Sequence, residues 1–239
     1  MKNIYAYLLP ARSILFFLIF IVCAQITKQE VGAISSYWSI IASIVNIITI
    51  AVLVLLAKLE KSSYPELINY HRGQSRFWKT LLLSLAVVII GMAGMYLAGF
   101  LCYGALMPAV SLKMIAPIPK GLAVINLLVL PVSTTLAEDG LYLGGGVGHI
   151  RNKYLAVIVP AFFYALQHCF IPTLFDIRYM AYRFFSFLPL TVIFCLYYRK
   201  KREPLPIMIG HTILDLATAG SILATSIIPG AYEQMENMM

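Results

Sequence analysis

Five ionisable side chains of this sequence lie inside long apolar stretches, where charged groups are costly. Glu138 and Asp139 lie near the end of one stretch. His168 lies in a second stretch, and His211 and Asp215 lie in a third. Carboxylates and imidazoles can activate water and stabilise the charge that develops during hydrolysis. Ionisable groups within a bilayer usually face a bundle interior or a wet cavity, so we expect these residues to converge on one site.

The spacing of these residues suits helices. His211 and Asp215 are four residues apart in "HTILD", and Tyr164 and His168 are four apart in "YALQH". Residues at this spacing share one face of a helix. A simpler interpretation stays open for each pair, because an intramembrane histidine is often a hydrogen-bonded packing residue and Asp215 could serve only to hold His211.

The adjacent acids Glu138 and Asp139 should play different parts. Neighbouring residues of an α-helix point about 100° apart, so both cannot point squarely into one cavity. We expect one of them to be the working group and the other to be its neighbour at the cavity wall or the interface. Asp139 could lie at the headgroup boundary or have a direct role, and both alternatives stay open.

The composition indicates an integral membrane protein. The 239 residues are 61% hydrophobic and 12% charged, whereas a soluble domain has about 25% charged residues. We therefore predict a single membrane domain over residues 1–239. The net charge of +8 comes from bases in short loops between apolar runs, which is typical of membrane orientation and not of nucleic-acid binding. The four cysteines lie in apolar runs without metal-ligand spacing, and we expect no disulfide.

The apolar runs predict an all-α, polytopic transmembrane helix bundle of about seven spans. A span needs about 20 mostly apolar residues, and more apolar runs follow the first, so the first is expected to be a retained span and not a cleaved signal peptide. The predicted spans are 8–26, 37–57, 78–104, 121–144, 155–175, 184–198 and 204–228.

The basic residues predict how the bundle is oriented in a cell membrane. Thirteen Lys and Arg side chains, Arg12 among them, are assigned to one side, and five, Arg178 and Arg183 among them, to the other. Cytoplasmic loops carry the excess of bases. The N-terminus is therefore expected in the cytoplasm and the C-terminus outside.

Three short motifs give the chain a family resemblance. They read "EDGLYL" at 138–143, "YALQH" at 164–168 and "HTILD" at 211–215. In order, spacing and placement they resemble the CAAX-processing and bacteriocin-processing (CPBP, or Abi) intramembrane protease family, whose pattern is E-E-x-x-x-R, F-x-x-x-H and H-x-x-x-N/D. The similarity covers about residues 120–220. The departures are Asp139 for the second Glu, Leu143 for Arg and Tyr164 for Phe.

The resemblance implies an intramembrane endopeptidase in the lipid bilayer that cuts a peptide or a membrane-protein substrate near the cytoplasmic face. Glu138 and His168 would polarise a water, and His211 with Asp215 would stabilise the oxyanion, supported by Asp139 and Tyr164. Two histidines and carboxylates could also bind Zn²⁺. Since the sequence has no H-E-x-x-H and the resemblance favours a glutamate-type mechanism, we expect no metal and no other cofactor.

Two other functions stay open. The family fold could serve a non-catalytic immunity or scaffold protein, which the loss of the motif arginine at Leu143 favours. A proton-coupled transporter could use Glu and His as a relay, but the sequence shows no inverted repeat and no pair of interrupted helices.

The expected depths of the motif residues conflict. Glu138 should lie near the cytoplasmic end of its span, whereas His168 follows Leu155 by thirteen residues, or about 20 Å of helix. The glycines of "GGGVGHI" at 144–150 could let a loop dip into the bundle and bring the residues together.

Overall fold

The computed structural model describes residues 4–238 and shows an all-α bundle. Six helices are long and apolar enough to cross a membrane, and α7 is a shorter apolar helix. The predicted fold class is confirmed, and the chain is a multi-pass membrane protein. The long helices are α1 (Ile4–Thr27), α3 (Trp38–Leu59), α5 (Phe77–Tyr103), α6 (Lys120–Asp139) with its continuation η2 (Gly140–Val147), α8 (Ile177–Lys201) and α9 (Leu205–Ile227); the shorter elements are α2 (Val31–Ser35), α4 (Tyr64–Leu67), η1 (Ala109–Ile115), α7 (Leu155–Gln167) and α10 (Ala231–Asn237).

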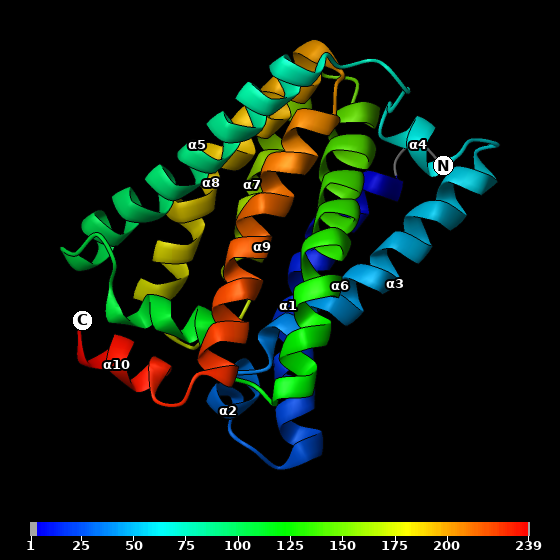
Figure 1. The fold of residues 1–239 in the computed structure, drawn as a ribbon. Coiled ribbons are helices and arrows are strands. Elements are labelled where there is room, and N and C mark those ends of the chain that lie inside the picture. Colours follow the sequence, from blue (N-terminus) through cyan, green and yellow to red (C-terminus); the bar gives the residue numbers. More distant parts are fainter. Residues whose placement is uncertain (1–3, 239) are drawn as a thin grey trace.

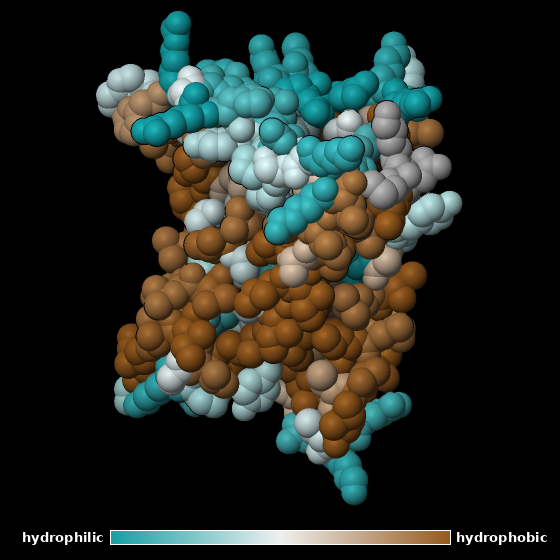
Figure 2. Space-filling view, turned by 90° about the vertical axis from the view of Figure 1, so that its right-hand side faces the viewer, coloured by the Kyte–Doolittle hydropathy of each residue, from teal (hydrophilic) through white to brown (hydrophobic). Residues whose placement is uncertain are grey.

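Helix α6 lies at the centre of the bundle. It packs against α3 on one side and α9 on the other, while α5 packs on α8 and α9, and α7 packs on α8. Helix α1 contacts α7 and η2. The two termini lie at opposite ends of the bundle (Figure 1). The space-filling view shows a brown apolar band across the middle with hydrophilic side chains at both ends (Figure 2), as a bilayer-spanning protein requires.

The fifth and sixth predicted spans differ from the structure. The helix predicted over 155–175 ends at Gln167, and the helix predicted over 184–198 begins at Ile177. The Asp176 side chain accepts hydrogen bonds from the backbone N–H groups of Arg178 and Tyr179, and such an N-cap fixes a helix start. Helix α7 is therefore only about 20 Å long, which is shorter than the hydrocarbon core of a bilayer, about 30 Å.

The glycine run after Glu138 is helical, which corrects the expected loop. Residues Gly140–Val147 form a buried π-helical turn that continues α6. A side chain at Gly145 would meet the Tyr5 ring at 2.6 Å, so glycine lets α1 approach this segment closely. Short π-helical segments are frequent at functional sites. This one places Glu138 nine residues before the helix end, about 12 Å deep, which largely removes the predicted conflict with His168.

Two bases that were counted toward the two membrane sides lie inside the bundle instead. Arg12 is 4% exposed in α1, and Arg183 is 7% exposed in α8. The basic asymmetry persists without them, because the loops on the N-terminal side still hold most of the Lys and Arg residues. The orientation of the termini stays a prediction.

Candidate functional site

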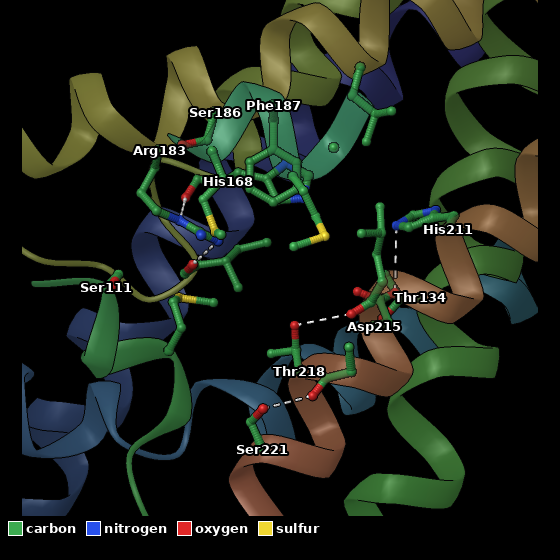
Figure 3. A pocket seen from close by; sticks show the side chains of 18 of the residues that line it. Ser111, Thr134, His168, Arg183, Ser186, Phe187, His211, Asp215, Thr218 and Ser221 are labelled. Carbon is green, nitrogen blue, oxygen red and sulfur yellow. Dashed lines mark hydrogen bonds and ion pairs between the residues drawn. The ribbon is translucent and has the colours of Figure 1, made fainter. Parts of the chain in front are cut away.

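The motif residues of α6, α7 and α9 line one cavity of about 390 Å³. Glu138, Tyr164, His168, His211 and Asp215 all contribute to its wall, which is otherwise mostly apolar. His168 lies on one side of the cavity with Phe187 and Arg183, and His211 and Asp215 lie on the opposite side (Figure 3). Three separate spans therefore bring their ionisable groups together.

Glu138 occupies the meeting point of the three helices. Its side chain is buried, and its Oε2 lies 3.8 Å from His168 Nε2 and 3.9 Å from His211 Nε2. Oε2 has no hydrogen-bond partner within residues 4–238. One carboxylate oxygen thus faces both histidines at a distance slightly longer than a direct hydrogen bond.

His168 follows the last residue of α7 and is held in one orientation. Its Nδ1 lies 2.8 Å from the backbone oxygen of Tyr164. A carbonyl oxygen only accepts, so Nδ1 donates, and Nε2 of the neutral ring is left as an acceptor toward Glu138. The ring also stacks on Phe187, with 3.5 Å between centroids and an interplanar angle of 14°.

His211 is flanked by carboxylates at both ring nitrogens. Its Nε2 lies 3.5 Å from Asp215 Oδ2, one helical turn further along α9. Its Nδ1 lies 3.5 Å from Asp139 Oδ2 and 3.2 Å from the Tyr164 hydroxyl. These neighbours fix the ring and let either nitrogen donate a hydrogen bond.

The second acid and the motif aromatic are bonded to each other. The Tyr164 hydroxyl donates to Asp139 Oδ1 at 2.9 Å, and both side chains are almost fully buried. Both residues depart from the family pattern, which has Glu and Phe. Tyr164 is longer than Phe by its hydroxyl, and this hydroxyl reaches the shorter side chain of Asp139. The two departures therefore complement each other. Asp139 does not line the cavity that Glu138 faces.

Arg12 is a site neighbour that the sequence interpretation missed. Its Nη2 lies 3.4 Å from Glu138 Oε1, and its Nε donates to Gln167 Oε1 at 2.7 Å. Asn46 and Thr49 of α3 accept further hydrogen bonds from it. A lone cation between apolar residues of an N-terminal span was the available signal, since intramembrane charges usually pair in the bundle interior.

Arg183 is a second buried cation that the sequence interpretation placed in a loop. Its Nε donates to the His168 backbone oxygen at 3.3 Å, and its Nη2 donates to the Ile171 oxygen at 3.1 Å. The last carbonyls of a helix lack intrahelical partners, and a cation there also suits the helix dipole. Arg183 therefore stabilises the end of α7 that carries His168.

Among residues 4–238, no three His, Cys, Asp or Glu side chains converge as a ligand set. The absence of a metal from the reaction stays a prediction.

Comparisons with known proteins identify the same part of the chain. Residues 120–217 match the family described as type II CAAX prenyl endopeptidase Rce1-like. This segment begins with α6, contains all three motifs and ends within α9. No curated protein and no solved structure matched the chain significantly. The family match supports a peptidase of the CAAX protease type in general. The segment that carries the three motifs is thus Rce1-like, and it relates the chain to the CAAX-processing and bacteriocin-processing protease family.

Proposed function

We propose that this protein is an intramembrane endopeptidase in which Glu138 and His168 activate the attacking water. One observation supports this most directly. Glu138 Oε2 and His168 Nε2 face each other at 3.8 Å, and Oε2 has no hydrogen-bond partner within the described chain. Two acceptors cannot bond to each other, whereas a water has two O–H donors and can satisfy both.

Such a water would be a nucleophile held by two bases. Its oxygen attacks the carbonyl carbon of the scissile peptide bond while one of its protons passes to Glu138. The C–N bond then breaks as Glu138 returns a proton to the leaving amine. General acid–base help of this kind is typically worth about 10²–10⁴-fold in rate.

His211 faces the same space from α9 and would donate to the oxyanion. Its two ring nitrogens are within 3.5 Å of Asp139 and Asp215 carboxylate oxygens. Asp215 cannot donate while ionised, so its part is to orient His211, unless it is protonated. Donors that are fixed before the reaction stabilise the charge without reorganising during it.

The cavity wall favours an apolar substrate. Methionine, leucine and isoleucine side chains from α5, the loop after α5, η1 and α9 line the cavity, among them Met92, Met107 and Leu214. Methionine adapts its shape to irregular apolar groups. The substrate is therefore an apolar peptide or a membrane-associated protein segment, with prenylated CAAX proteins and peptide precursors as the two classes that the family suggests.

Cleavage by the purified protein tests this proposal. The substrates are a prenylated CAAX peptide and a set of fluorogenic apolar peptides, presented in detergent and in vesicles. Glu138→Gln and His168→Ala should lose cleavage by about 10²-fold or more, whereas Asp139→Asn should lose less because Asp139 does not line the cavity. Full cleavage by Glu138→Gln at matched protein levels would refute the catalytic glutamate.

Two controls separate the remaining alternatives. A chelator should leave the rate unchanged, and a loss that Zn²⁺ restores would instead indicate a metal enzyme. A scaffold or immunity protein, which the Leu143 departure favours, would cleave nothing and would keep its binding readout in both Glu138→Gln and His168→Ala.

A further inference from the structure

The position of the missing motif arginine has become part of the apolar core. Leu143 is fully buried in the η2 segment and belongs to the same apolar cluster as Leu9 and Val147. No cation of α6 or η2 makes an ion pair with Glu138 within the described residues. The cation beside Glu138 comes from α1 instead, one helical turn after Leu9.

The guanidinium of Arg12 is held by partners from three other helices. Arg12 itself belongs to α1, Asn46 and Thr49 to α3, Gln167 to α7 and Glu138 to α6. Each of these four partners accepts from one of its nitrogens. An arginine in this setting is fixed in position and plane, because its donors form a rigid fork.

The two carboxylate oxygens of Glu138 have different neighbours, and Arg12 contacts only one of them. Oε1 lies 3.4 Å from Arg12 Nη2, while Oε2 faces His168 and His211 and has no hydrogen-bond partner within residues 4–238. The carboxylate is therefore held through the oxygen that does not face the histidines. Gln167, the residue before His168, accepts from the same guanidinium, so one side chain sets both halves of the pair.

We propose that Arg12 is a positioning residue that takes the place of the motif arginine, supplied by α1 and not by the motif helix. It orients Glu138 so that Oε2 alone presents to His168 and to the water. The active site then extends beyond the Rce1-like segment of residues 120–217 and is incomplete without α1. This inference rests on the proposed endopeptidase function.

Steady-state kinetics of Arg12→Gln and Arg12→Lys, with the same peptide substrates, test this role. A misplacement of about 1 Å at a reacting group can cost about 10²-fold, and we expect Arg12→Gln to lose that much in kcat with KM little changed, because positioning acts on the transition state. Arg12→Lys keeps the charge but cannot reach all four partners. Its kcat should therefore fall between that of the wild type and that of Arg12→Gln. Ser13→Ala, at the next buried position of α1, should behave as the wild type.

Each outcome of this experiment decides between roles. A kcat of Arg12→Gln equal to that of the wild type, with only a lower unfolding temperature, would show that Arg12 is purely structural and would overturn the proposal. A wild type that cleaves no peptide would refute the proposed function. In that case the pairing itself is still tested by thermal unfolding, in which the Arg12→Gln/Glu138→Gln double variant should be more stable than Arg12→Gln alone. A double variant no more stable than Arg12→Gln would overturn the pairing as well.

Discussion

Replacing Tyr164 by phenylalanine would restore the family's residue and yet should destabilise this protein. The hydroxyl of Tyr164 donates to Asp139 Oδ1 at 2.9 Å, and it is the one donor within residues 4–238 that makes a hydrogen bond to that oxygen. The ring stacks on Tyr142, with centroids 4.4 Å apart, so a phenylalanine ring should keep its place. The change then removes one hydrogen bond and leaves a buried carboxylate oxygen without a donor.

The size of the effect follows from the charge of the acceptor. A hydrogen bond to a charged group contributes about 1.5–3 kcal/mol to the free energy of unfolding. For a protein of about this length, 1 kcal/mol changes the melting temperature by about 2–4 °C. Tyr164→Phe should therefore lower the melting temperature by about 3–12 °C. Cleavage should also slow, because Asp139 and the hydroxyl both contact His211.

Tyr198→Phe is the matched control. Tyr198 is fully buried, and its hydroxyl has no hydrogen-bond partner within the described chain. Removing a hydroxyl that makes no bond should be neutral or stabilising. Thermal unfolding of both variants in one detergent measures the difference. Equal changes in the two variants, or no change in Tyr164→Phe, would contradict the assigned hydrogen bond.

Two further predictions concern packing and topology. Gly94→Ala should cost about 1–3 kcal/mol, because a Cβ there would lie 2.6 Å from the Ser186 backbone oxygen of α8. Gly220→Ala is the control, because a Cβ there would have no neighbour within 4 Å, and it should be neutral or stabilising by up to about 1 kcal/mol. Similar thermal shifts in both variants would refute the close α5–α8 contact. A reporter after residue 239 should be active outside the cytoplasm and one within residues 60–76 inside, and cytoplasmic activity of both would contradict the orientation.

The spans could be predicted from the sequence because hydropathy over about 20 residues is a strong signal. The ends of α7 and α8 could not, since the stretch between His168 and Asp176 is apolar enough to read as a continuing helix. The end of α7 depends on contacts with a residue distant in sequence, because Arg183 donates hydrogen bonds to the backbone oxygens of His168 and Ile171. The Asp176 cap was the one local signal for the start of α8.

The depth of Glu138 illustrates a different difficulty. A glycine run such as 144–146 predicts a loop from propensity alone, whereas here it forms buried π-helix. Close packing explains the difference, because side chains at Gly145 and Gly146 would meet Tyr5 and Pro160 at less than 3 Å. Tertiary contact therefore overrides the local preference, and the longer helix places Glu138 at the level of His168.

The departures from the family motifs can be explained by the contacts that the substituted residues make. Asp139 is shorter than Glu by one methylene, and Tyr164 is longer than Phe by the hydroxyl that bonds to it. Leu143 lacks the cation of the motif, and Arg12 places a guanidinium against Glu138 from another helix. A buried carboxylate without a partner is costly in a membrane, so loss of the motif arginine requires a replacement from some neighbouring helix. That requirement names no sequence position. The sequence marks Arg12 only as a lone cation within a span, and its contact with Glu138 becomes recognisable in three dimensions.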